Sequence, residues 1–285
     1  MSNVQRLERA PQMSWWSALT TRKPGLSEGE TIPSIALELG NIQAQQVSEY
    51  QRICGYPESD ILPLPLPHIL ATPLHIALAT HPEFPLPAMG LVHVSNSIVQ
   101  HRPIKAHETL TITCRCEGHR PHPRGALVDL QTEIVSGNER VWESQTTALS
   151  KSAPGGGTKQ EQNPTAPMVV ERSTNWRLPE NLGRKYGVIS GDKNPIHLFA
   201  WSAKLFGFKR HIIHGMWLLG RAISELDADI GSGPVQVDID FVRPVFLPGS
   251  VLFESGRQGQ DIGFALSNPK NGKSHARGRV HPLGS

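Results

Sequence analysis

The stretch from Tyr186 to Leu226 reads YGVISGDKNPIHLFAWSAKLFGFKRHIIHGMWLLGRAISEL. Its middle predicts a helix that begins at Pro195, because proline suits the first helical position and Asn194 is a good cap. The apolar residues at 196, 199, 200, 203 and 206 then fall on one face, and Gly207 ends the helix. The stretch is therefore a loop, a helix and a second apolar segment.

Two titratable residues flank the start of that predicted helix. Asp192 lies in the loop before it and His197 lies in its first turn, so both side chains can reach one small volume. A carboxylate and an imidazole that titrates near neutral pH are the groups that acid and base chemistry on a water molecule requires. The alternative is that Asp192 only caps the helix. The presence of His197 at this spacing favours acid and base chemistry instead.

The second apolar segment predicts a largely buried helix that begins at Gly215 and continues to Leu226. The first N–H groups of a helix have no partner within the helix, and a glycine there allows a ligand to approach the backbone closely. An oxyanion site can be built at such a position. His214 is expected to cap this helix or to pack, and Trp217 to lie in the core or in the wall of a pocket.

Composition describes a globular chain of 285 residues with a net charge of +3. The basic residues are scattered, so nucleic acid is not an expected partner, whereas a mild positive field suits an anionic small ligand. The charge-free run Ile61–Pro82 contains five prolines and is a poor bilayer helix, and the start of the chain shows no secretory stretch. We expect no membrane association and a cytoplasmic location.

The segment 151–167 is rich in Gly, Pro and polar residues and predicts an exposed linker between two halves. Alternating and β-branched residues predict strands in each half, and helices precede the strands, which is an α+β pattern. The predicted strands are 90–99, 109–116, 126–135, 140–149, 235–242, 251–255, 263–266 and 275–280.

The two halves also repeat short patterns in the same order. The dipeptides at 102–103 and 243–244 are both Arg-Pro before an apolar strand, and Tyr50–Gly55 is similar to Tyr186–Gly191. Thr72-Pro73-Leu74 and His214-Gly215-Met216 each precede an apolar helical stretch. Three similarities at nearly constant spacing indicate two copies of one fold.

The segment from Ser190 to His197, followed by His214-Gly215-Met216, resembles the MaoC-like, (R)-specific enoyl-CoA hydratase family. This resemblance implies a double hot-dog fold, in which two antiparallel sheets each wrap a central helix. The implied organisation is a degenerate first repeat over 1–150, a linker over 151–167 and a catalytic repeat over 168–285.

The resemblance also implies an activity, the reversible hydration of a trans-2-enoyl thioester of coenzyme A or a carrier protein in fatty-acid metabolism. Asp192 and His197 match the catalytic pair, and the N–H of Gly215 matches the donor to the thioester oxygen. No metal and no redox cofactor are implied, and a homodimer is expected by family habit. The residues expected to shape the substrate site are Asn194, Ser190, His214, Met216 and Trp217.

The first half lacks the residues that would carry this chemistry. Gly55 is followed by Tyr56 and Pro57, with no later histidine at the catalytic spacing, and Pro73 stands where the second half has Gly215. Because proline has no N–H, that position cannot donate to an oxyanion. We therefore expect one active site per chain.

Other interpretations remain open from the sequence. The chain could dehydrate a branched or dicarboxylic hydroxyacyl thioester, or could be a non-catalytic subunit that binds thioesters. Arg102 and Arg243 are read as structural corners in preference to phosphate contacts. Four histidines without a paired motif are read as surface or strand residues, and four basic residues near the site as solvated or as phosphate contacts; these are His93, His101, His119, His122, Lys193, Lys204, Lys209 and Arg210.

Overall fold

The computed structural model describes residues 4–11, 23–27, 30, 32–116, 118–153, 155–156 and 168–284, without the side chains at 42, 43 and 89. The predicted linker at 151–167 lies mostly outside this range, so the domain boundary there stays a prediction. Within the described ranges, no helix combines the length and the apolar character needed to cross a bilayer.

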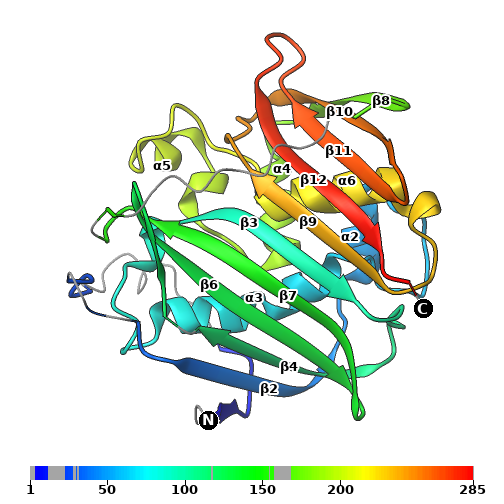
Figure 1. Ribbon diagram of the computed structural model, residues 1–285. Helices are drawn as coiled ribbons and strands as arrows, with labels where there is room; N and C mark the ends of the chain where they lie inside the picture. The colour runs from blue at the N-terminus through cyan, green and yellow to red at the C-terminus, as the bar shows by residue number, and fades with distance from the viewer. Residues whose placement is uncertain are drawn as a thin grey trace.

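The strands form one continuous, mainly antiparallel sheet across the molecule (Figure 1). Its order is β1-β2-β4-β6-β7-β3-β9-β12-β11-β10-β8, and β5 pairs with β6. The strands of the first half are β1 (Val4–Leu7), β2 (Ile35–Gln43), β3 (Leu91–Gln100), β4 (Thr109–Cys116), β5 (Arg120–His122), β6 (Gly125–Ser136) and β7 (Glu139–Ser150). Those of the second half are β8 (Arg172–Leu178), β9 (Val235–Phe241), β10 (Gly249–Gln258), β11 (Asp261–Ser267) and β12 (Ser274–Pro282).

The helices of each half follow its first strands, β1 and β2 or β8, and precede the remaining strands, so the expectation that helices come before all the strands is wrong. The first half has α2 (Val47–Cys54), α3 (Leu66–Thr80) and the 3-10 turn η1 (Ala88–Gly90). The second half has α4 (Leu182–Ser190), the 3-10 turn η2 (Pro195–His197), α5 (Ala200–Lys204) and α6 (Gly215–Ile230). Figure 1 shows α3 lying along the strands of the first half and α6 along those of the second.

The two halves have the same strand order, which confirms the expected α+β double hot-dog fold. The order β2-β4-β6-β7-β3 in the first half corresponds to β8-β10-β11-β12-β9 in the second. The halves meet where β3 and β9 pair antiparallel, from Ser95 opposite Asp240 to Gln100 opposite Val235. The two expected sheets are thus joined into one, because each half covers an open edge of the other.

Side chains of α6 also tie the halves together. The carbonyl of Cys54, at the end of α2, accepts hydrogen bonds from Ser224 Oγ (2.7 Å) and Arg221 Nη1 (3.2 Å). Trp217 Nε1 donates to the carbonyl of Ile53 (3.0 Å). The last carbonyls of a helix have no partner within it, so these contacts satisfy groups that would otherwise be unpaired.

The central helix of the first half differs from the prediction at Pro73. This proline lies inside α3, which begins seven residues earlier at Leu66, and so it is not the counterpart of the first residue of α6. Prolines at 65 and 67 occupy the first turn of α3, where a missing N–H costs nothing. The proline argument for an inactive first half is therefore wrong, whereas the missing acid and base pair stands.

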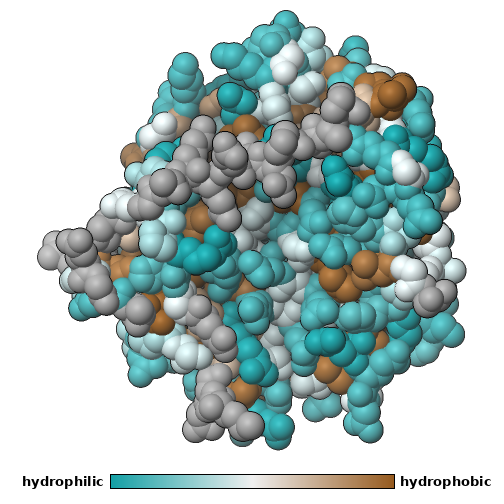
Figure 2. Space-filling view, viewed as in Figure 1, coloured by the Kyte–Doolittle hydropathy of each residue, from teal (hydrophilic) through white to brown (hydrophobic). Residues whose placement is uncertain are grey.

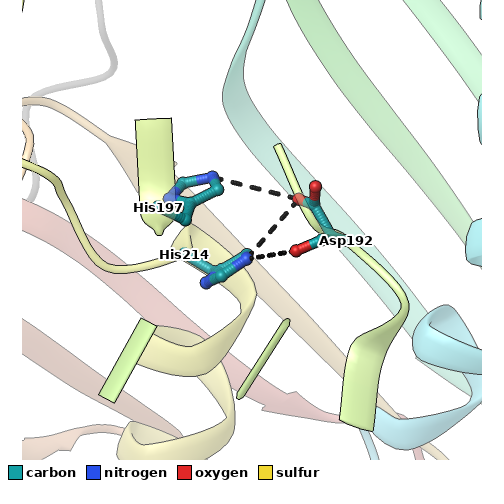
Figure 3. A group of neighbouring side chains, drawn as sticks. All are labelled: Asp192, His197 and His214. Atoms are coloured by element: carbon teal, nitrogen blue, oxygen red, sulfur yellow. Dashed lines mark hydrogen bonds and ion pairs between the residues drawn. The ribbon is translucent and has the colours of Figure 1, made fainter. Parts of the chain in front are cut away.

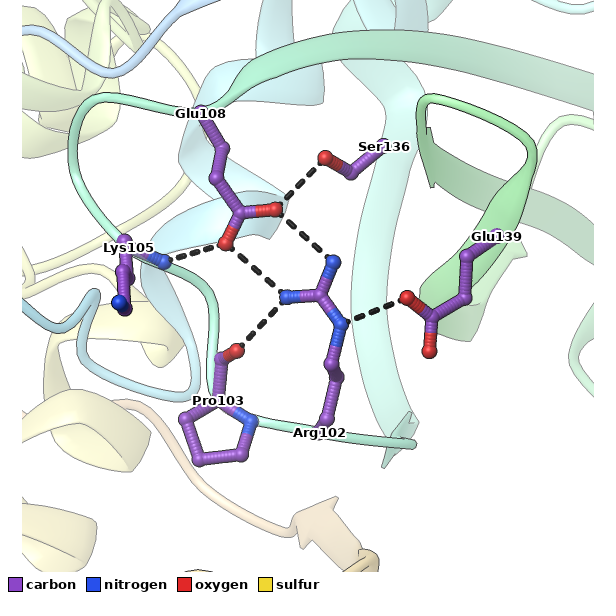
Figure 4. Close-up of polar contacts among 6 residues, drawn as sticks. All are labelled: Arg102, Pro103, Lys105, Glu108, Ser136 and Glu139. Atoms are coloured by element: carbon purple, nitrogen blue, oxygen red, sulfur yellow. Dashed lines mark hydrogen bonds and ion pairs between the residues drawn. The ribbon is translucent and has the colours of Figure 1, made fainter.

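The Arg-Pro corner after β3 is structural, as expected (Figure 4). The guanidinium of Arg102 donates to both carboxylate oxygens of Glu108 at 2.9 Å and to Glu139 at 2.8 Å. Glu108 also accepts from the backbone N–H of Lys105 and from Ser136 Oγ. The hydrogen bonds from Arg102, aided by those from Ser136 and Lys105, lower the pKa of Glu108 to about 2. The corner is thus held by ion pairs and hydrogen bonds that meet at Arg102 and Glu108.

The outer face of the sheet is largely hydrophilic, with scattered hydrophobic patches (Figure 2). A shallow groove of about 360 Å³ on this face is lined by polar side chains from β3, β4, β6 and β7, among them Arg115, Gln131 and Glu133. Apolar residues of the strands point to the opposite face, against α3 and α6, where the core lies.

Candidate active site

The loop after α4 is built from successive turns in which a side chain accepts a backbone N–H. Gly191 ends α4 with a positive φ of 73°, which glycine adopts without strain. Ser190 Oγ then accepts from the N–H of Asp192 at 3.2 Å, and Asp192 Oδ1 accepts from the N–H of Asn194 at 3.1 Å. Asn194 Oδ1 accepts from the N–H of Ile196 at 3.3 Å, which is the predicted cap. These turns hold the Asp192 carboxylate in place.

His197 closes this loop with a fixed ring orientation. Its Nδ1 donates to the carbonyl of Ile212 at 2.8 Å, so that Nε2 carries the free lone pair. Nε2 lies 3.9 Å from Asp192 Oδ2 (Figure 3). Burial lowers the pKa of His197, and the charge of Asp192 only partly opposes this effect. A neutral imidazole therefore faces a carboxylate across a short gap, and both atoms are hydrogen-bond acceptors.

His214 contacts both members of the pair formed by Asp192 and His197. Its ring stacks on His197 with centroids 3.7 Å apart, and its Nε2 donates to the backbone carbonyl of Asp192 at 2.9 Å (Figure 3). Burial, and then the neighbouring His197, lower its pKa to about 3. It occupies the cap position of α6 but makes no capping hydrogen bond, so its contribution is to packing and to the position of the loop.

Gly215 is the first residue of α6, as predicted. Its N–H has no acceptor within the helix, and the residue comes directly after His214 in the chain. A side-chain Cβ at this position would lie 3.0 Å from two ring atoms of Phe241, closer than ordinary van der Waals contact. Glycine at this position thus allows Phe241 of β9 to pack closely against the start of the helix.

The other predicted site residues divide into two groups. Ser190 and Asn194 lie in the turns around Asp192 and hold its loop. Met216 and Trp217 are both buried in the core, where Trp217 packs edge-on against Trp176 with centroids 6.2 Å apart. The side chain of Trp217 points toward α2 through its hydrogen bond to Ile53.

The single helix predicted from Pro195 to Phe206 is wrong. The chain forms η2 and α5, separated by Leu198 and by Phe199 in an extended conformation with φ −141°. Phe199, predicted to face the core, is 42% exposed, and its ring lies under the guanidinium of Arg184 at 4.8 Å. In a continuous helix the carbonyl of Leu198 would accept a backbone N–H of that helix. Because the helix is interrupted here, this carbonyl accepts a hydrogen bond from Arg184 instead.

One site residue comes from the first half and was read from the sequence as an ordinary strand histidine. His93 on β3 contacts the Phe241 ring edge-on, with centroids 4.9 Å apart. Burial lowers its pKa to about 4, while its hydrogen bond to the Ser95 carbonyl and the charge of Asp192 act in the opposite direction. No local pattern in the sequence singled out His93, because its contact with the site depends on the pairing of β3 with β9.

Ligand atoms of Asp192, His197 and His214 lie within 4.8 Å of one another, so a metal ion must be considered. A metal requires a lone pair from each ligand. Nε2 of His214, the ring nitrogen that faces this group, is committed as a donor to the Asp192 carbonyl, so only Asp192 and Nε2 of His197 offer lone pairs to it. This donor set does not fit a three-ligand metal site, and the expectation of metal-free chemistry is unchanged.

Comparison with known proteins bears on this geometry. The family description "MaoC like domain" matches residues 154–278. 3-Hydroxyacyl-thioester dehydratase X of Mycobacterium tuberculosis is 31% identical over 253 residues, covering 88% of this chain and 89% of that protein. The chain belongs to the MaoC-like dehydratase family. The family resemblance predicted from the two motifs is thereby confirmed.

Solved structures agree with this MaoC-like assignment. The crystal structure of HtdX of Mycobacterium tuberculosis superposes with a TM-score of 0.76 at 29% identity, covering 87% of this chain and 100% of that chain. A second protein of that organism, described as having a double hotdog fold, gives a TM-score of 0.58 at 12% identity and covers 90% of this chain and 96% of that one. The second likeness concerns the fold alone.

Proposed function

We propose that this MaoC-like protein is a hydro-lyase that interconverts trans-2-enoyl and (R)-3-hydroxyacyl thioesters. The observation that carries the proposal is the pair of acceptors, Asp192 Oδ2 and His197 Nε2, held 3.9 Å apart beside the open end of α6. The name of the relative, a 3-hydroxyacyl-thioester dehydratase, supports the same reaction.

The two acceptors suit a water molecule that donates one hydrogen to each. Its oxygen then faces the substrate with a lone pair directed at C3. As the new O–C3 bond forms, one proton of the water passes to this pair, and the electrons of the C2=C3 bond move toward the thioester oxygen. The proton is returned to C2, so that the elements of water add across the double bond. Dehydration follows the same steps in reverse.

Negative charge on the thioester oxygen needs a donor in place before the reaction. The N–H of Gly215 is such a donor, because it is unpaired within α6 and lies at the positive end of a helix of 16 residues. The proton transfers and this hydrogen bond account for the reaction, so we propose that neither a metal nor a redox cofactor takes part.

The lowered pKa of His197 defines the working protonation state. Because its folded pKa lies below the ordinary 6.5, the imidazole is neutral at neutral pH and accepts a hydrogen bond from water. His214 is a positioning residue in this scheme, since it fixes the Asp192 backbone and supports the His197 ring without facing the substrate.

The carrier of the acyl group is proposed to be coenzyme A or a carrier-protein pantetheine. Lys193, Lys204, Lys209 and Arg210 are exposed on the segment that surrounds the site, and their charge suits phosphate groups. We propose a cytoplasmic enzyme, and a homodimer is compatible with the family.

The test is the ultraviolet absorbance of the conjugated enoyl thioester. On mixing the protein with crotonyl-CoA, and then with longer 2-enoyl-CoAs, the absorbance should fall as hydration removes the double bond. The product should be the (R) isomer by chiral chromatography. A folded protein that leaves every coenzyme A and carrier-protein substrate unchanged would contradict the proposal and favour a subunit that only binds thioesters.

A further inference from the structure

The apolar core of the first half contains a group of buried polar side chains between α3 and the sheet. On α3, His68, Thr72 and His75 are each no more than 9% exposed. His75 Nε2 lies 2.7 Å from Thr132 Oγ1 on β6, which shows that this side of α3 faces the sheet. The matching helix of the second half, α6, buries Met216, Leu219 and Ile223 instead.

The sheet contributes polar groups to the same interior. Ser144 on β7 is the direct cross-strand partner of Thr132, so both side chains point toward α3. Two residues further along β7, Thr146 faces the same way and accepts a hydrogen bond from Asn96 Nδ2 at 2.8 Å. We call this set the polar interior; its members are His68, Thr72, His75, Asn96, Thr132, Ser144 and Thr146.

Several atoms of the polar interior are left without partners. Among the described residues, His68 Nδ1, Asn96 Oδ1 and Ser144 Oγ are buried and have no hydrogen-bond partner, and neither has Oε1 of the neighbouring Gln100. Leaving such a group unpaired in a protein interior is costly, so buried polar atoms normally bind something. Three of these atoms, on His68, Asn96 and Ser144, belong to the polar interior, which indicates a site that a polar group completes.

His93 connects the polar interior to the active site. On one side its ring is nearly parallel to that of His68, with centroids 6.0 Å apart. On the other side it meets Phe241, whose ring lies against Gly215. The rings of Phe241, His93 and His68 thus lead from Gly215, the proposed donor to the thioester oxygen, to the polar interior.

The charge and the hydrogen-bonding character of these groups define what they can bind. Burial lowers the pKa of His75 to about 3 and of His93 to about 4, and lowers that of His68 as well, so all three are neutral at neutral pH. An acyl carboxylate would meet no positive charge in this set. Asn96 Oδ1 and Gln100 Oε1 can only accept, so their partner must carry an O–H or N–H group.

We propose that the polar interior of the first half binds the distal part of the acyl chain and selects 2-enoyl thioesters that carry an uncharged hydroxyl group on that chain. This inference rests on the proposed hydro-lyase activity. A hydroxyl group donates to Asn96 Oδ1 and accepts from Ser144 Oγ, and it thereby pairs groups that a plain alkyl chain would leave unpaired.

The test is a series of 2-enoyl-CoAs of equal length whose chains are plain, carry one hydroxyl at successive distal positions, carry a keto group there, or end in a carboxylate. We expect kcat/KM to be at least about tenfold higher for one hydroxyl position than for the plain chain, because a site built to bind a hydroxyl discriminates against analogues that lack it. The keto chain should fall between them, and the carboxylate should be poorest.

Asn96→Leu should abolish the preference and raise the relative rate on the plain chain, while Gln145→Leu, an amide on the outer face of β7, should change neither. The wild-type ratio tests the proposal even where Asn96→Leu fails to fold. Equal kcat/KM across the series would mean that water satisfies these atoms and would overturn the proposal, with hydro-lyase activity intact. Turnover of no substrate in the series would instead overturn the activity itself.

Discussion

The two halves of this molecule have one topology and differ in what their central helices bury. In the second half, α6 begins at a glycine beside Asp192 and His197, and its core face is apolar. In the first half, α3 begins among prolines and carries histidines on its inner side, and Tyr56 follows Gly55 where Asp192 follows Gly191. Under the proposed function, the second half carries the chemistry and the first half recognises the acyl chain.

The largest expected effect comes from removing the base on the catalytic side. His197→Gln keeps a polar side chain but removes the ring nitrogen that faces Asp192. We expect kcat to fall by about 10³, within the range typical of acid and base catalysis. Steady-state hydration of crotonyl-CoA measures it, and an unchanged melting temperature would show that the fold is intact. A variant that retains a third of the wild-type rate would remove His197 from the mechanism.

A second expected effect concerns the start of α6. In Gly215→Ala the new methyl group meets the Phe241 ring at about 3.0 Å, and we expect the helix end and its N–H to shift in response. We expect kcat to fall by about 10², the cost of one oxyanion donor. The double variant Gly215→Ala with Phe241→Leu should recover part of the loss because the ring is gone. Absence of any recovery would mean that the ring contact does not position the donor.

A smaller effect is expected at His214, which acts through Asp192. His214→Phe preserves the stacked ring and removes the hydrogen bond to the Asp192 carbonyl. We expect kcat to fall about tenfold with KM little changed, since misplacement of a reacting group slows catalysis without weakening binding. His214→Asn, which retains a donor, should restore some of the rate. A change confined to KM would place His214 in substrate binding instead.

The smallest effect concerns stability, at the two Arg-Pro corners. Glu108 has a folded pKa of about 2, below its ordinary 4.5, so its carboxylate stabilises the fold above about pH 4.5, and this stabilisation is lost as the pH falls through about 2. We expect Glu108→Gln to cost about 2 kcal/mol at neutral pH, after allowance for solvent screening of the partly exposed Arg102.

Urea unfolding across this pH range measures the difference between Glu108→Gln and wild type, which should vanish near pH 2. The matched change in the second half is Arg243→Met, which loses only an exposed hydrogen bond to the Ser274 carbonyl. It should alter stability by less than about 0.5 kcal/mol. Equal costs at the two corners would contradict the difference between the halves.

Local patterns in the sequence predicted much of this structure. Alternating residues located eight strands, and the spacing of Asp192, Asn194 and His197 placed all three in one turn, because short-range turns depend on neighbouring residues. Strands β1, β2, β5 and β8 were not predicted.

Contacts between residues far apart in the chain could not be predicted from the sequence. The stacking of His214 on His197 joins residues from separate elements, and His93 reaches the site only because β3 pairs with β9. The expected helix at 195–206 is interrupted at Leu198 and Phe199, and the carbonyl of Leu198 accepts a hydrogen bond from Arg184 of α4. Pro73 was assigned to a helix start because it was matched to Gly215 in the internal repeat, whereas it lies inside α3.

The central claim is that each chain has one catalytic site, in its second half. The most direct test is to measure hydration by Asp192→Asn and Tyr56→Phe side by side in one assay, because these residues follow the matching glycines of the two halves. The account predicts a loss of about 10³ for Asp192→Asn and nearly wild-type turnover for Tyr56→Phe. A hundredfold loss in Tyr56→Phe, or full activity in Asp192→Asn, would contradict it.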